Sequence, residues 1–229
     1  LGTEVSEGDC AEFARAEEKE GGVWLERPEN VEERIVELLA GGAMLGRLHG
    51  RVDLGRRGLG NRSLLCRGDL PELRRAATQL LRPDVFWMEV PALALESELA
   101  AAYGDAAKLP AGTVGEYWLT PREANAWSGR LNPKAPLPVQ ITTEASDPGT
   151  AALVRGFRAA VGRTPLLCAP WLNRRGQLVR DCRDARECWR QQGLDGVVAG
   201  SYVVLRKADP ESVEPKRAAL ARRPFYGGF

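Results

Sequence analysis

The sequence is poor in the residues that build metal centres and histidine-dependent catalytic sites. Among 229 residues there is a single histidine, His49, and the five cysteines contain no Cys-x-x-Cys pair. Structural zinc sites need four cysteine or histidine ligands at short spacings, and a catalytic triad needs a histidine beside its nucleophile. We therefore expect no metal site, no disulfide framework and reduced intracellular thiols.

Long apolar runs and an excess of charge of one sign are also missing. No stretch reaches the 18 or so apolar residues of a membrane helix, and the formal net charge is only +1. Such a balance provides no overall field to attract nucleic acid or an anionic membrane. We predict a cytoplasmic protein with no nucleic-acid partner and no membrane partner. The first residue is Leu1 rather than Met, from which we expect a fragment or a processed chain.

Lysine is scarce, whereas arginine gathers in one glycine-rich segment. Only five of the 32 basic residues are lysines, and residues 50–63 hold four arginines and four glycines. Glycine lets backbone N–H groups approach an anion, and a guanidinium group grips phosphate oxygens through paired hydrogen bonds. The segment is therefore a candidate phosphate site, and a surface turn with solvated arginines is the alternative.

Hydrophobic periodicity predicts alternating helices and strands in one domain. The composition, 44% hydrophobic and 28% charged, is typical of a globular protein. We predict a strand over 43–49 that leads into the glycine–arginine segment, a helix that starts after Asp147-Pro148, and a last strand over 197–205. The expected class is α/β, with a domain over residues 1–207 and a tail over 208–229.

Several segments, taken in order, resemble the C-terminal domain of the O-carbamoyltransferases that act on nodulation factors and antibiotics. Residues 50–63 resemble the Gly-Arg-x-Glu-x-Gly-Pro-Arg-Ala-Leu-Gly-x-Arg-Ser signature of that family. Residues 1–4, 162–179 and 193–202 resemble its opening, its second conserved strand-turn-strand and its closing strand. The resemblance implies a YrdC-like twisted mixed sheet with flanking helices around a basic cavity.

The resemblance also implies a ligand, a cofactor and a partner. Such a domain uses ATP, and by extension Mg²⁺, with carbamoyl phosphate to form carbamoyl adenylate. An actin-like N-terminal domain then transfers the carbamoyl group to a hydroxyl of a small molecule. By this resemblance, the phosphate or nucleotide site has two walls. The first is formed by Arg51, Arg57, Arg62 and Ser63, and the second by Asn173 and Arg175.

The chain departs from the family at several of its motifs. Asp53, Arg56 and Gly58 replace Glu, Pro and Ala of the loop signature. The expected Lys-x-Arg-x-x-Phe-Arg-Pro-Phe-Ala-Pro segment is largely lost over 81–91, and the Asn-Thr-Ser-Phe-Asn-x-Arg-Gly turn is reduced to its last part over 169–176. Loss of charge-stabilising groups predicts weak or absent activation chemistry, since one such donor is worth about 100-fold in rate.

Two functional hypotheses follow from this pattern. The first is a carbamoyltransferase module that binds ATP or carbamoyl phosphate, with no residue assigned a catalytic role. The second is a degenerate, non-catalytic scaffold or regulatory domain that docks on a partner. Two residues have alternative interpretations. Asp53 is either a Mg²⁺ ligand or a partner of Arg51 or Arg57. His49 either contacts phosphate or is a packed side chain.

Overall fold

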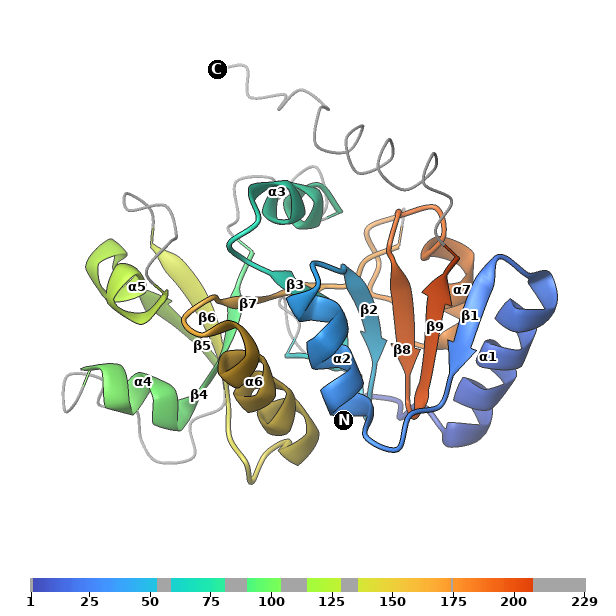
Figure 1. Ribbon diagram of the computed structural model, residues 1–229, viewed down its shortest axis with the longest axis horizontal. Coiled ribbons are helices and arrows are strands. Elements are labelled where there is room, and N and C mark those ends of the chain that lie inside the picture. The colour runs from blue at the N-terminus through green and yellow to red at the C-terminus, as the bar shows by residue number, and fades with distance from the viewer. Residues whose placement is uncertain are drawn as a thin grey trace, which may run out of the picture.

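The protein is described from a computed structural model (Figure 1). The described residues are 2–52, 59–80, 90–103, 115–128, 136–173 and 175–207. Among them, no helix is long and apolar enough to cross a membrane. Arg57 and the proposed tail, 208–229, lie outside the described residues, as does most of the 81–91 segment.

The described strands form one mixed sheet. Its spatial order is β1-β9-β8-β2-β3-β7-β4-β6-β5. In chain order the strands are β1 (Val23–Glu26), β2 (Leu45–Leu48), β3 (Arg62–Arg67), β4 (Ala92–Leu95), β5 (Gly115–Leu119), β6 (Leu137–Thr142), β7 (Leu166–Pro170), β8 (Gly196–Ala199) and β9 (Tyr202–Arg206). The pairs β2–β8 and β4–β6 are parallel, and the other pairs are antiparallel.

The helices cover both faces of this sheet (Figure 1). They are α1 (Glu7–Glu20), α2 (Val31–Ala40), α3 (Pro71–Leu80), α4 (Glu96–Tyr103), α5 (Pro121–Ser128), α6 (Pro148–Val161) and α7 (Cys182–Cys188). The pair α2 and α6 lies against one face, where an added Cβ at Gly156 would be 3.1 Å from Val36. The pair α1 and α7 covers the other face.

Side-chain alternation along the central strands explains the two layers. In β3, Leu65 faces the core beneath α2 and α6, whereas Leu64 and Cys66 face the opposite core, to which α1, α3 and α7 contribute. Successive side chains of a strand point to opposite faces, so a fully apolar strand can serve two cores at once. Both faces of the central sheet are therefore buried.

The predicted α/β class is confirmed, and so are several local signals. Asp147 caps α6 by accepting a hydrogen bond from the backbone N–H of Thr150 at 2.9 Å, and Pro148 is the first helical residue. Both features belong to the commonest way of starting a helix. The strand predicted over 43–49 is present as β2.

The prediction of one strand over 197–205 is wrong. That segment forms the antiparallel hairpin of β8 and β9, which turns at Gly200 and Ser201. Gly200 has φ = +53°, a conformation that glycine adopts without steric cost. Valines on both sides of the turn hide the break in a pattern that reads as one continuous apolar strand.

The strand directions bring two distant segments to the same edge of the sheet. Both β2 and β7 are antiparallel to β3, so they run in the same direction. The segment after β2 begins at His49, and the segment after β7 begins at Trp171. The two predicted walls of the ligand site therefore start at the same edge of the sheet, from strands that flank β3.

Candidate functional site

The buried guanidinium group of Arg62 connects the segments at this edge. Arg62 is fully buried at the start of β3. Its side chain donates hydrogen bonds to backbone carbonyls of several segments, which are those of His49 (2.6 Å), Asn61 (3.0 Å), Gly50 (3.0 Å), Arg180 (2.8 Å) and Thr3 (3.4 Å). One side chain thus holds both ends of the glycine–arginine loop, the N-terminal segment and the segment before α7.

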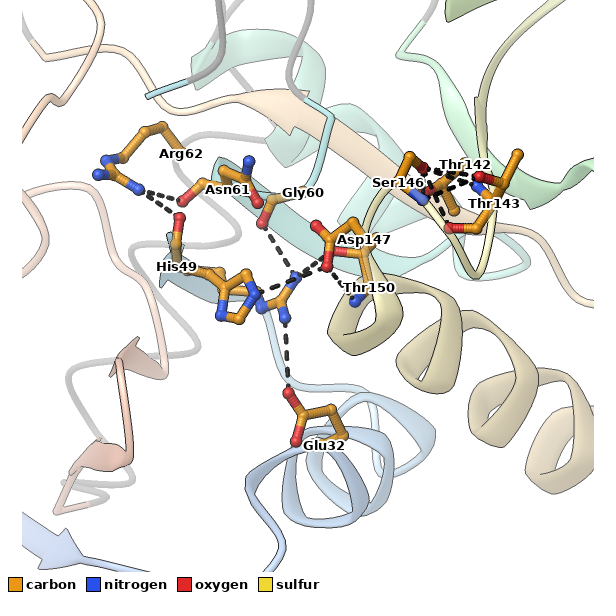
Figure 2. A network of polar contacts seen from close by, with 11 residues as sticks. Glu32, His49, Gly60, Asn61, Arg62, Thr142, Thr143, Ser146, Asp147 and Thr150 are labelled. Carbon is orange, nitrogen blue, oxygen red and sulfur yellow. Dashed lines mark hydrogen bonds and ion pairs between the residues drawn. The ribbon is translucent and has the colours of Figure 1, made fainter. Parts of the chain in front are cut away.

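This arrangement gives Arg62 a structural role. A guanidinium group carries five N–H donors in a planar fork, and here the donors satisfy carbonyls of four chain segments. Phosphate binding by Arg62 stays a prediction, and it would require these contacts to be shared or exchanged. Figure 2 shows the Arg62 side chain directed to the carbonyls of His49 and Asn61.

The N-terminal segment also fastens the loop. The backbone N–H of Val5 donates to the carbonyl of Gly50 at 3.2 Å, and that of Val52 donates to the carbonyl of Thr3 at 3.0 Å. Between them, Arg51 keeps 55% of its side chain exposed, with Nη2 3.4 Å from the Glu4 carboxylate. Arg51 is therefore a solvent-accessible cation on a fixed backbone.

Ser63 has a local role at the end of the loop. Its side chain is fully buried, and its Oγ accepts a hydrogen bond from the backbone N–H of Gly60 at 3.1 Å. Gly60 has φ = +106°, and an added Cβ would lie 3.1 Å from Oγ1 of Thr150. Glycine is needed here for both the backbone conformation and the close approach of α6.

On the second wall, Asn173 shapes a turn. Its Oδ1 accepts hydrogen bonds from the backbone N–H groups of Arg175 (2.9 Å) and Gln177 (3.0 Å), as in an Asx turn. Arg175 is exposed on this turn. The wall is joined to the first one because the backbone N–H of Trp171 donates to the carbonyl of Arg62 at 2.9 Å.

Sequence reasoning missed a buried polar network beneath the loop. Arg47, in the middle of β2, is 1% exposed and donates to Oγ1 of Thr150 at 2.7 Å and to the carbonyl of Gly60 at 3.3 Å. Its Nη2 lies 3.7 Å from the carboxylate of Glu32 on α2. A charged residue inside an otherwise apolar strand was the available signal, because such a residue is buried only with partners.

His49 and Asp147 form the exposed rim of this network (Figure 2). The Nε2 atom of His49 lies 3.6 Å from Oδ1 of Asp147, and 34% of the His49 side chain is exposed. Oγ1 of Thr150 donates to Oδ2 of Asp147 at 2.7 Å. Burial alone raises the pKa of Asp147, but hydrogen bonds from His49 and Thr150 outweigh it and hold that pKa well below its ordinary value.

This pKa shift predicts a pH dependence of stability. A carboxyl group whose pKa is depressed by folding stabilises the protein above its ordinary pKa of about 3.9, and this contribution is lost as the pH falls further. Asp147→Asn should therefore lower the free energy of unfolding at pH 7, and the deficit should shrink towards pH 3. Urea unfolding of the wild type and of the variant at several pH values from 3 to 7 gives the two free energies of unfolding. A deficit that does not change with pH would mean that the loss comes from altered hydrogen-bond geometry rather than from the charge of Asp147, since asparagine also caps helices.

The second wall begins at a core residue, Trp171. Trp171 is fully buried, and its indole N–H donates to Oε1 of Gln192 at 2.7 Å. An added Cβ at Gly46 would lie 2.6 Å from the Trp171 ring, so β2 has no room for a side chain at that position. A large indole therefore stands where the resemblance leads to a small hydroxyl residue.

A cavity of about 370 Å³ lies between α1 and the start of α7. Its lining has both signs of charge, including Asp9, Glu12, Arg183 and Arg186. It differs from the predicted basic cavity, which depends on loop residues 53–58 outside the described part of the chain. In the described residues, no cluster of three or more metal-binding side chains is present.

The fold and the site define an α/β domain in which a buried arginine, Arg62, holds both ends of the glycine–arginine segment at one edge of the sheet. The family described as "Carbamoyltransferase C-terminus" matches residues 36–206. The chain belongs to this family.

The chain is also similar to nodulation protein NolO of Bradyrhizobium diazoefficiens. The two are 23% identical over 211 residues, which cover 90% of this chain and 37% of that protein. The chain thus spans little more than a third of the length of this relative.

Proposed function

We propose that this chain is the module of a carbamoyltransferase that binds ATP or carbamoyl phosphate in support of carbamoyl adenylate formation. The observation that carries the proposal is the rigid attachment of the glycine–arginine loop. Arg62 holds the two ends of the loop, and residues 3–5 pair with its first residues. Anchored ends reduce the conformational entropy that a segment loses when it binds an anion.

The exposed donors at this edge suit an anionic ligand. Three accessible side chains can donate hydrogen bonds to an anion, namely those of Arg51, Arg175 and His49. Each carboxylate described here has a partner, since Asp147 caps α6 and contacts His49, and Glu32 faces Arg47. The exposed carboxylate of Glu4 pairs with Arg51, and an anionic ligand would compete with it for that guanidinium group. Arg57, from the family signature, would add a further guanidinium group. Mg²⁺ would accompany ATP as its counter-ion.

The transfer step itself would require a partner. The family is defined as a carbamoyltransferase C-terminus, and the chain covers 37% of the relative NolO. We infer that an actin-like N-terminal domain would complete the enzyme and that it would provide the site for the acceptor hydroxyl.

Calorimetric titration with ATP–Mg²⁺ and with carbamoyl phosphate tests the binding step. We expect saturable binding of at least one ligand to the wild-type chain, and Arg57→Ala should weaken it about tenfold or more, since a charge-assisted hydrogen bond is worth about 1.5–3 kcal/mol. Arg122→Ala, an exposed arginine on the distant helix α5, is the matched control and should bind as the wild type does. Absence of heat with both ligands would refute the proposal.

The buried indole of Trp171 favours a second candidate function, a non-catalytic domain that keeps the fold to dock on a partner. Positions 169–171 hold alanine, proline and tryptophan where hydroxyl and amide donors are expected, and all three residues are buried. Pyrophosphate release assayed with ATP and carbamoyl phosphate separates the two functions. Binding without pyrophosphate release would identify a ligand-binding domain that has lost activation chemistry.

A further inference from the structure

The cavity between α1 and the start of α7 has no role in the proposed carbamoyltransferase function. The two helices lie side by side at one end of the sheet (Figure 1). Residues of the segment 3–16 form one wall of the cavity, and residues of the segment 180–186 form the other. Its volume of about 370 Å³ is within the range of about 300–1,000 Å³ that is typical of small-molecule sites. The cavity is therefore large enough for a small metabolite.

Hydrogen bonds hold both walls of this cavity in place. The helix α1 begins with a capping box, and Asp181 caps α7 by accepting a hydrogen bond from the backbone N–H of Asp184 at 2.9 Å. The buried Arg62 ties the walls to each other, because it donates to the carbonyl of Thr3 on one side and to that of Arg180 on the other. Walls that are fixed before binding reduce the conformational entropy that binding costs.

Two exposed side chains of opposite charge line opposite walls of the cavity, Glu12 on α1 and Arg183 on α7. In the part of the chain that the structure describes, neither of them forms an ion pair, with the other or with a third residue. The other two arginines of the lining are paired with carboxylates, at 3.0 Å for Arg180 and 3.3 Å for Arg186. A carboxylate and a guanidinium group on opposite walls are thus available to a ligand that carries both charges.

Apolar side chains make up another part of the lining. Phe13 is a buried core residue that also lines the cavity, and Val5 packs against the same core. A second carboxylate, that of Glu4, lies on the wall that holds Glu12 and keeps 60% of its side chain exposed, with Arg51 at 3.4 Å. Small-molecule sites typically combine an apolar lining with a few charged groups that fix the orientation of the ligand.

We propose that this cavity binds a small zwitterion of the class of the apolar α-amino acids. The carboxylate of the ligand pairs with Arg183, its ammonium group pairs with Glu12, and its apolar side chain contacts Phe13 and Val5. A guanidinium group binds a carboxylate through charge-assisted hydrogen bonds, which are stronger than hydrogen bonds between neutral groups. This inference does not depend on which ligand the glycine–arginine loop binds.

Titration of the full chain with L-leucine, followed by NMR of the backbone amides, tests the inference. We expect saturable shifts in the two wall segments, 3–16 and 180–186. Arg183→Gln and Glu12→Gln should each weaken binding about tenfold or more, because each removes one charge-assisted contact. Glu18→Gln is the matched control, since Glu18 is exposed on α1 outside the cavity lining, and it should bind L-leucine as the wild type does.

Two analogues test the charges on the wild-type chain without any substitution. N-acetyl-L-leucine lacks the ammonium charge and L-leucinamide lacks the carboxylate, so each should bind about tenfold or more weakly than L-leucine. Absence of saturable shifts with L-leucine would overturn the inference. Equal binding of L-leucine by the wild type and by both charge variants, or equally tight binding of the two analogues, would overturn it as well, because the cavity would then not recognise a zwitterion.

Discussion

Arg62→Ala should lower the free energy of unfolding by about 3–5 kcal/mol, one of the two largest effects that we expect from a single substitution in the described part of the chain. The substitution removes hydrogen bonds to the carbonyls of several chain segments, of which those of Thr3, Gly50 and Asn61 keep a backbone N–H donor, whereas those of His49 and Arg180 lose the donor described above. Each buried acceptor that loses its partner costs about 1–3 kcal/mol. Urea unfolding followed by circular dichroism gives the change in free energy.

Two further variants define what Arg62 contributes. Arg62→Lys keeps the positive charge but should recover less than half of the loss, because an ammonium group cannot reach carbonyls on both sides as a planar fork does. Arg175→Ala, at an exposed position, should change the stability by about 0.5 kcal/mol or less. Full stability of the Arg62→Lys protein would show that charge alone, rather than the geometry of the fork, holds the loop.

Glu17→Ala should also destabilise the protein by about 3–5 kcal/mol. Glu17 lies on α1 with no exposed surface, and its carboxylate accepts hydrogen bonds from the indole N–H of Trp189 at 3.0 Å and from Nε of Arg190 at 2.9 Å. Removing the carboxylate leaves a half-buried cation and a buried indole N–H without their acceptor. Chemical unfolding gives the difference in free energy.

Glu20→Ala is the matched control for Glu17, one helical turn further along α1. Glu20 keeps 49% of its side chain exposed and approaches the same partners, with 3.3 Å to Arg186 and 3.9 Å to Arg190. Exposed ion pairs of this kind contribute about 0–1 kcal/mol, so the variant should remain close to the wild type. Equal losses in the two variants would show that burial does not distinguish these carboxylates.

These two residues hold different parts of the molecule together. Glu17 ties α1 to the end of α7, whereas Arg62 ties the N-terminal segment and the loop to the start of α7. The N-terminal region is thus fixed at both ends of the interface between α1 and α7. Mutations in the N-terminal region should therefore also disturb residues 50–52, where the proposed ligand loop begins.

The sequence predicted those elements whose signals are local. The capping pair Asp147-Pro148 and the apolar strand before the loop were readable, because caps and periodicity depend on residues close in the chain. The β8–β9 hairpin was misread because its tight turn interrupts a valine-rich segment with a single glycine and serine. The local sequence does not indicate that the residues before the turn pair with β2 and the residues after it pair with β1.

At the candidate site, too, the sequence predicted the local motif but not the tertiary contacts of its residues. The motif over residues 50–63 predicted a loop with arginines for an anion, and the family match confirms the ancestry that this motif suggested. It did not distinguish Arg51, which is exposed, from Arg62, which is fully buried and bonded to carbonyls. The identical side chains differ in role because strand pairing buries one of them and leaves the other at the surface.

The sequence by itself determined that this chain is an α/β domain of the carbamoyltransferase C-terminal family, since periodicity and ordered motifs are properties of the chain. Only the tertiary structure decided that Arg47, Asp147 and Thr150 meet beneath the loop and that the buried carboxylate of Glu17 accepts a hydrogen bond from the indole N–H of Trp189, 172 positions further along the chain. The physical reason is that burial, hydrogen bonding and pKa depend on distances in space, which the packing of the sheet and its helices sets.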